Sequence, residues 1–152
     1  KNRLIAIESE YLSKEAEVEQ KCLTEFTEAF HNSRTECAEF EKTLKDSPQE
    51  LADVQQRFRE ELSPWFNQSW FFERAKSKPR GYPGDFVMLT ALYDEDVKSE
   101  GIGRILDLYF LQADLARAVR TRLADVKQFV IEEVQNREDQ VTILNVASGP
   151  GR

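Results

Sequence analysis

The sequence has few of the features that mark membrane, secreted or metal-binding proteins. None of its 152 residues belongs to an apolar run of 18 or more, so no membrane-spanning helix is expected. Two cysteines and one histidine are present, Cys22, Cys37 and His31, and no Cys-x-x-Cys pair occurs. On one helix the cysteines would lie about 22 Å apart along the axis, which exceeds disulfide reach. We therefore expect reduced cysteines, no metal site and a cytoplasmic protein.

Clustered positive charge is also scarce. The formal net charge is -7, from 28 acidic and 21 basic residues, and an acidic surface disfavours nucleic acid as the main partner. One basic cluster interrupts this pattern, formed by Arg74, Lys76, Lys78 and Arg80. It is either a solvated turn or a local binding surface for a carboxylate, because arginine offers a two-pronged donor array to that group.

The N-terminal part of the chain is predicted to be helical. Residues 1–45 contain no glycine or proline, and their apolar side chains recur at helical spacing. The capping-box spacing of Ser33 and Glu36 indicates a break near Asn32. The stripe suits a dimerisation arm or a helix packed on its own domain. We favour the second interpretation, because the register of the stripe drifts and phenylalanine is uncommon in coiled-coil seams.

Two Ser-Pro pairs predict the next helix starts. Ser47 and Pro48 suit the N-cap and first position of a helix that extends to about Leu62, and Ser63-Pro64 repeats the signal. Five large aromatic residues follow within eight positions. They indicate the core of a small helical domain, although a lipid or ring pocket cut into that core stays open. These residues are Trp65, Phe66, Trp70, Phe71 and Phe72.

The stretch PRGYPGD, residues 79–85, has specific local chemistry. Pro83 and Gly84 suit the two central places of a type II turn, which needs a positive φ at the glycine. Asp85 is then placed to cap a helix over 86–93. Gly81 supplies a second bend, so Tyr82 is held between two bends. The loop either presents Tyr82 to a ligand or is a tight connection between helices.

The last third of the chain is predicted to contain two helices and a strand. After a flexible joint at residues 101–103, helices are expected over 104–112 and 114–135, the second with one apolar face. Val141–Val146 is typical of a buried strand of a parallel sheet. The small residues 147–151 follow it. A turn of this kind lets the backbone approach a nucleotide-like ligand.

Residues 78–152, with PRGYPGD and VTILNVASGPGR in this order, resemble a family of class I S-adenosylmethionine-dependent methyltransferases. Some members make the methyl ester of a 3-hydroxy fatty acid. The resemblance implies a mainly α chain: a helical cap domain over residues 1–140, then, over 141–152, the first strand and glycine turn of a truncated Rossmann-like domain. It also implies that this piece alone neither binds S-adenosylmethionine well nor methylates a substrate.

The resemblance also implies site residues. No residue is assigned as a general base, and an ionised carboxylate acceptor would need none. The glycine turn departs from the family form D-x-G-x-G-x-G, since Asn145 replaces the acid and Ala147 the first glycine. The expected cofactor contacts are Tyr82, Asp85, Ala147, Ser148, Gly149 and Gly151, and the expected substrate contacts are Arg80 and Tyr82.

The expected partner is a small-molecule substrate, and a homodimer through the N-terminal helix or the C-terminal strand is a further expectation. The alternative function is an all-helical dimerisation or sensor module without catalysis. The two differ in whether residues 141–151 serve a cofactor site.

Overall fold

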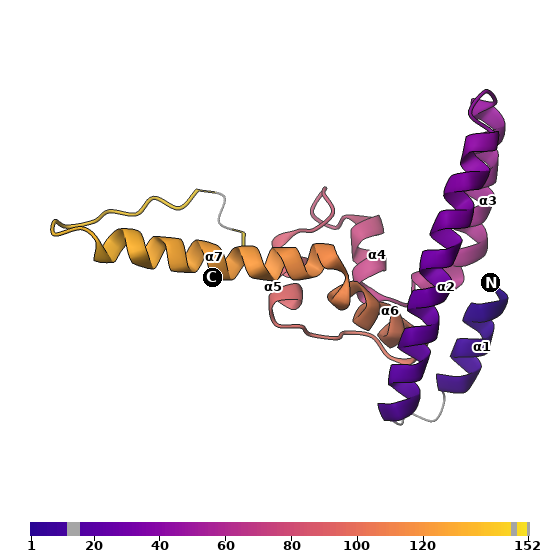
Figure 1. Ribbon diagram of the computed structural model, residues 1–152, viewed down its shortest axis with the longest axis horizontal. Coiled ribbons are helices and arrows are strands. Elements are labelled where there is room, and N and C mark those ends of the chain that lie inside the picture. The colour runs from indigo at the N-terminus through magenta and orange to yellow at the C-terminus, as the bar shows by residue number, and fades with distance from the viewer. Residues whose placement is uncertain (12–15, 147–148, 152) are drawn as a thin grey trace. The chain divides into compact units, whose positions relative to one another are not determined.

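The computed structural model describes residues 1–11, 16–146 and 149–151 of the chain. Its described residues form α-helices joined by turns and extended segments (Figure 1). In chain order the helices are α1 (Asn2–Glu10), α2 (Ala16–Thr43), α3 (Pro48–Phe66), α4 (Trp70–Ser77), α5 (Phe86–Tyr93), α6 (Gly101–Gln112) and α7 (Asp114–Gln135).

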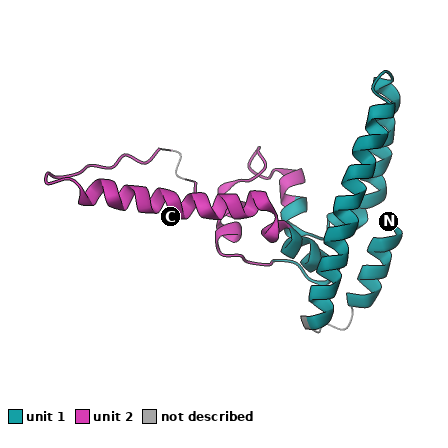
Figure 2. Cartoon of the chain, in the orientation of Figure 1, with its two compact units in different colours: residues 1–73, 98–109 teal, residues 74–97, 110–152 magenta. Residues whose placement is uncertain are grey.

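The chain divides into two compact units (Figure 2). Unit 1 consists of residues 1–73 and 98–109, and unit 2 consists of residues 74–97 and 110–152. Each unit is therefore built from two separate stretches of the sequence.

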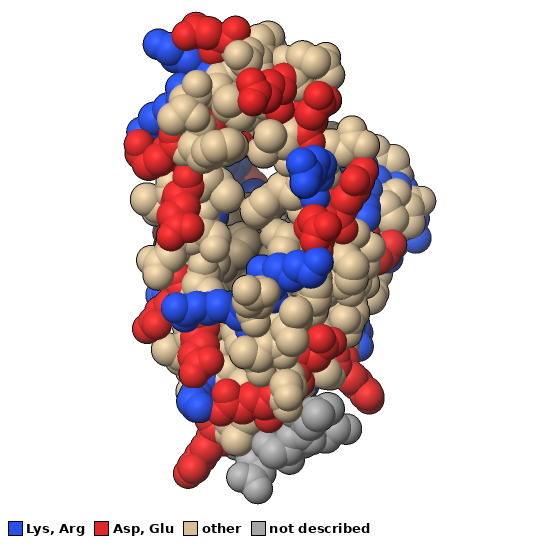
Figure 3. Space-filling model, turned by 90° about the vertical axis from the view of Figure 1, so that its right-hand side faces the viewer, with Lys and Arg blue, Asp and Glu red and all other residues tan. Residues whose placement is uncertain are grey.

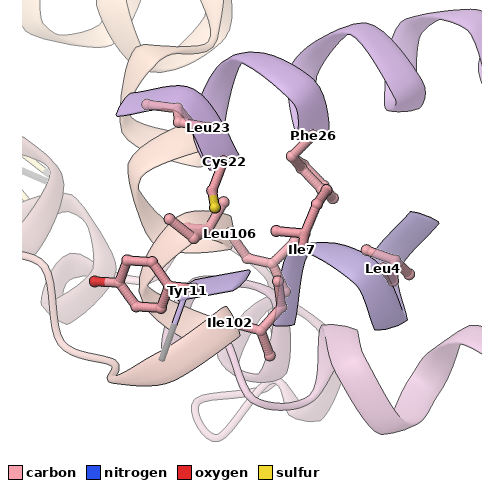
Figure 4. Packing of buried hydrophobic residues seen from close by; sticks show 9 residues of the cluster. Leu4, Ile7, Tyr11, Cys22, Leu23, Phe26, Ile102 and Leu106 are labelled. Carbon is pink, nitrogen blue, oxygen red and sulfur yellow. The ribbon is translucent and has the colours of Figure 1, made fainter. Parts of the chain in front are cut away.

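Unit 1 is held together by an apolar core that α1, α2 and α6 share. α1 packs on α2, and the first turns of α6 contribute Ile102, Ile105 and Leu106, each at most 1% exposed. Figure 4 shows Ile102 and Leu106 of α6 lying close to Ile7 of α1 and Cys22 of α2. Aromatic residues from α2, α3, α4 and α6 surround the core, so the aromatic-rich stretch is core, as favoured above. They are Phe30, Trp65, Phe66, Phe72 and Tyr109.

The predicted break near Asn32 was wrong. α2 continues through that residue, from Ala16 to Thr43, and α1, Asn2–Glu10, is a separate helix. Folding α1 back on α2 buries Leu4 and Ile7 against the same core that α2 lines. This burial removes more apolar surface from water than one continuous helix would. The stripe is therefore packed on its own unit from Leu4 to Phe30, whereas Phe40 is 50% exposed.

The second Ser-Pro pair does not start a helix. α3 runs through Pro64 to Phe66. Proline has no N–H to donate to the carbonyl four residues earlier, which is that of Glu60. The hydroxyl of Ser63 donates to this Glu60 oxygen at 3.0 Å and so satisfies it.

Residues 101–103 form the first turn of α6 and are not a flexible joint. Ile102 is 1% exposed. A Cβ built on Gly103 would lie 2.2 Å from the backbone oxygen of Gln68. Glycine is therefore required here because α6 approaches the turn before α4 at backbone distance.

Asp107 of α6 links the turn before α4 to residues 98–99 through hydrogen bonds. This carboxylate is fully buried. It accepts hydrogen bonds from the Ser69 hydroxyl at 2.5 Å and from the amides of Lys98 and Ser99 at 3.2 and 3.0 Å. A buried carboxylate is tolerated when its oxygens are satisfied in this way. The sequence signal for it was a single acidic residue within the apolar run ILDLYFL.

Unit 2 is built around α5, which packs on α7. Met88, Ala91 and Leu92 of α5 are buried, as are Leu111 and Ala116. The predicted bounds of both α5 and α7 are confirmed. Ala116 is the buried residue of α7, so the rest of this helix has at least part of its surface in contact with solvent.

The predicted strand at Val141–Val146 was wrong, and with it the Rossmann-like part of the fold. No described residue is in a strand, and 141–146 has no regular secondary structure. Ile143, Leu144 and Val146 are 60%, 86% and 76% exposed. A parallel strand exists only when neighbouring strands satisfy its backbone and cover its two faces. In the described part of the chain no segment does so.

The Gly103 contact gives the first prediction. In an open helix, Gly→Ala stabilises by about 0.5–1 kcal/mol. We expect Gly103→Ala to destabilise unit 1 instead, by about 1–3 kcal/mol. The new methyl group would clash with the backbone of Gln68, which cannot move aside by changing a rotamer as a side chain can. Urea denaturation followed by circular dichroism measures the difference. A Gly103→Ala protein at least as stable as wild type would contradict the close contact.

Candidate functional site

The loop before α5 is anchored by a buried carboxylate. Asp85 is 1% exposed and is the N-cap of α5, where its Oδ1 accepts from the amides of Val87 and Met88 at 3.0 and 3.1 Å. The predicted cap is therefore confirmed. Arg74, near the end of α4, completes the arrangement: its Nε and Nη2 donate to the two Asp85 oxygens at 3.1 and 2.7 Å.

This geometry changes the interpretation of the basic cluster. Arg74 does bind a carboxylate through two hydrogen bonds, but this carboxylate is that of Asp85 in the same chain. Asp85 in turn uses both oxygens within unit 2. The pair therefore positions the loop: it fixes the end of α4 to the start of α5, while the residues between them are left at the surface.

The pair also has a defined pH dependence. The Arg74 guanidinium, with the amides of Met88 and Val87, lowers the pKa of the Asp85 carboxyl, against the opposing effect of its burial. A lowered folded pKa means that ionised Asp85 stabilises the fold above its unfolded pKa of about 3.9. That stabilisation is lost as the pH falls through the lower folded pKa.

Two glycines shape the loop between Arg74 and Asp85. Gly81 and Gly84 have φ values of 86° and 73°, which confirms the positive φ predicted at Gly84. The amide of Gly81 donates to the carbonyl of Lys78 at 2.7 Å and closes the first bend. Tyr82, between the two bends, is 52% exposed. The loop thus displays this ring from a backbone that is constrained on both sides.

Arg80 lies against the same helix start. Its guanidinium carbon is 4.4 Å from the ring centroid of Phe86, the first residue of α5. This stacking on a ring face is favourable for a cation. Because Arg80 is itself exposed, stacking orients the guanidinium and leaves its outer face open to solvent. Arg80, Tyr82 and Phe86 together form an exposed cluster, which we call the loop cluster.

The predicted glycine turn is partly described. Ala147 and Ser148 lie outside the described residues, whereas Gly149 and Gly151 have φ values of 60° and 70°. A Cβ on Gly149 would be 3.6 Å from the Cδ1 atom of Leu89. Leu89 is in α5, one turn after Asp85. The structure therefore brings Gly149 against the helix that follows the PRGYPGD loop.

A second charged cluster, in unit 1, is satisfied internally. Glu19 accepts from the Tyr11 hydroxyl at 2.8 Å and from Arg104 Nε at 2.5 Å. Burial, followed by the hydrogen bond to Glu19, raises the pKa of Tyr11, and Arg104 lowers the pKa of Glu19. The three residues link α6 and α2 to the end of α1. We assign them a structural role.

On the face shown in Figure 3, acidic and basic side chains are interspersed with uncharged surface. Among the described residues, no group of three or more His, Cys, Asp or Glu side chains is arranged to hold a metal ion. None of the helices described combines the length and apolar character that crossing a bilayer requires.

Comparisons with known proteins find no relative: no family model, no curated protein and no solved structure matches this chain. The interpretation of the loop cluster therefore rests on its own geometry and on the two sequence motifs.

The Asp85 anchor gives the second prediction. At pH 7 we expect Asp85→Ala to lower the free energy of unfolding by about 2–4 kcal/mol, because it removes both a helix cap and the partner of Arg74. Asp85→Asn should cost less, because asparagine also caps helices. Urea denaturation at pH 7 and below pH 4 measures both.

The pH series separates charge from capping. Wild type should lose more stability than Asp85→Asn on acidification, since the variant lacks this titrating group. Asp53→Asn, at an exposed position of α3, is the matched control, because it makes the same substitution away from Arg74. Equal acid dependence of wild type and Asp85→Asn would refute the role of the Arg74 pair.

Proposed function

We propose that this chain is the N-terminal helical part of an S-adenosylmethionine-dependent methyltransferase. The proposed methyl acceptor is a small molecule, of the carboxylate or hydroxy fatty acid class. The observation that carries the proposal is the proximity of Gly149 to α5, the helix that follows the PRGYPGD loop in unit 2. Gly149 of the glycine turn lies beside Leu89, in the helix that Asp85 of the PRGYPGD loop caps.

The residues at this place fit the chemical groups of the cofactor. The adenine ring needs a flat apolar surface, which the half-exposed Tyr82 offers. Close approach of a ligand to the backbone needs residues without side-chain bulk, and Gly149 and Gly151 supply them. When bound, the cofactor would supply an electrophilic methyl group on its sulfonium.

The residues of this chain would bind and orient the reactants. Arg80, held over Phe86, would bind the carboxylate of the acceptor through two parallel hydrogen bonds. Asp85 and Arg74 would act as positioning residues, because they hold the loop without facing the reactants. A carboxylate acceptor is already ionised near neutral pH, so this assignment requires no general base. The rate enhancement would come from alignment of the two reactants.

We also propose that the protein works in the cytoplasm. Both cysteines are free, with Cys22 buried and Cys37 half-buried. This state suits a reducing compartment.

The loop cluster gives the third prediction. Titrating the isotope-labelled 152-residue chain with S-adenosylhomocysteine should shift NMR amide signals of residues 81–86 and 149–151. A short 3-hydroxy fatty acid should shift those near Arg80. We expect dissociation constants on the order of millimolar, since the chain would supply only part of the site.

Variants make this test specific. Tyr82→Ala should weaken binding of S-adenosylhomocysteine severalfold, and Arg80→Gln should weaken binding of the acid. Phe40→Ala and Arg59→Gln change an aromatic residue and an arginine on exposed parts of α2 and α3 and should have no effect. If neither ligand shifts these signals at 10-fold excess over the expected constant (about 10 mM), or if the controls weaken binding equally, the methyltransferase proposal fails.

A second function, a helical interaction module without catalysis, is supported by a different observation. Several large apolar side chains of α7 are exposed, with Phe129 the most exposed of those beyond Val126. An exposed apolar face of this kind marks interaction surfaces. An unchanged spectrum in the ligand titrations, together with self-association, would favour this function.

A further inference from the structure

α7 carries a broad apolar stripe that unit 2 covers only in part: Leu115, at its start, is 76% exposed. At 100° per residue, its members fall within about 140° around the helix axis. Near the start of the helix, Ala116 is buried. Beyond it, Val126 is 54%, Phe129 62% and Val134 39% exposed. We call the α7 stripe the set Leu115, Val119, Leu123, Val126, Phe129, Val130 and Val134.

Exposure of this extent on one helix needs an explanation. Single apolar residues on a surface are common, whereas a contiguous apolar stripe marks a binding surface. A helix of 22 residues is about 33 Å long, so the stripe extends over a length comparable with that of helix–helix interfaces. Figure 1 shows α7 as the longest helix of unit 2, drawn in orange.

The charges along α7 indicate what covers the stripe. The first ten residues, 114–123, carry three arginines and one aspartate, a net +2. Residues 124–135 carry Asp125, Glu132, Glu133 and one lysine, a net -2. Arg117 and Arg122 are exposed, as are the two glutamates. The helix is therefore complementary in charge to an antiparallel copy of itself.

We propose that two copies of this chain pair through α7, antiparallel, about a two-fold axis between Lys127 and Gln128. The α7 stripe of each copy packs on that of the other, and Arg122 of one copy, which the helical wheel places beside the stripe, lies near Glu133 of its partner. The contact is isologous, so it closes as a dimer. A parallel pair would set arginines against arginines, which electrostatics disfavours.

The acidic half of α7 also argues against a lipid surface as the occupant. Amphipathic helices that bind membranes carry basic residues along the polar face. Glu132 and Glu133 lie beside Phe129 and Val134, which are 62% and 39% exposed, and would be repelled by anionic lipid headgroups.

The first experiment tests the stripe. Sedimentation velocity of the full chain over a concentration series should show a reversible dimer. Val126→Ser with Phe129→Ser should raise its dissociation constant by about tenfold or more, because apolar area is removed from both copies. The matched control is Ala124→Ser with Gln128→Ser, two exposed positions on the opposite side of the helix, and it should dimerise like wild type. Circular dichroism checks that the helices are retained.

The second experiment tests the antiparallel arrangement by reversing charge. Arg122→Glu makes both members of the Arg122–Glu133 contact acidic, and Glu133→Arg makes both members basic. At low salt each variant should dimerise more weakly than wild type. An equimolar mixture of the two should form the heterodimer with near wild-type affinity, because each acidic residue then meets a basic one.

Several outcomes would overturn the proposal. A monomer at about 100 μM excludes the dimer. An unchanged dissociation constant for Val126→Ser with Phe129→Ser excludes the stripe as its interface. Failure of the mixed charge variants to associate excludes the antiparallel arrangement. Binding of a monomeric chain to vesicles of anionic phospholipid assigns the stripe to a membrane instead.

Discussion

Asp85 is the constraint on which the candidate site depends. A carboxylate that is 1% exposed stays ionised only where donors replace the water it has lost, and here Arg74 and the first amides of α5 do so. The same hydrogen bonds join the end of α4 to the start of α5. The intervening loop has both ends fixed, and its two positive-φ glycines define its path. Tyr82 and Arg80 are held at the surface as a consequence.

Unit 1 also depends on a close contact that a buried carboxylate accompanies. The start of α6 approaches the turn at Gln68 so closely that only glycine fits at position 103. Asp107, inside the same contact, accepts the hydrogen bonds of Ser69 and of the residue 98–99 backbone. An apolar core between α1, α2 and α6 then excludes water from these polar groups, which strengthens their hydrogen bonds.

Local rules predicted the parts of the fold in which neighbours in the sequence supply the interactions. The bounds of α5 and α7, the Asp85 cap and the positive φ of Gly84 were of this kind. The errors arose where distant residues decide. Val141–Val146 has the composition of a strand, but a strand needs partners. Residues 101–103 have the composition of a joint, but their contact with Gln68 makes them the start of a helix.

The sequence by itself determined helix content, the sites of the main turns and the candidate residues Arg80, Tyr82 and Asp85, because propensity, capping and glycine conformation act over a few residues. Tertiary structure decided what those residues do. It made Arg74 the partner of Asp85 instead of a ligand contact, set Gly149 beside Leu89 and left the α7 stripe exposed. Such pairings depend on which surfaces meet when the chain folds, and the spacing of residues along one element does not contain that information.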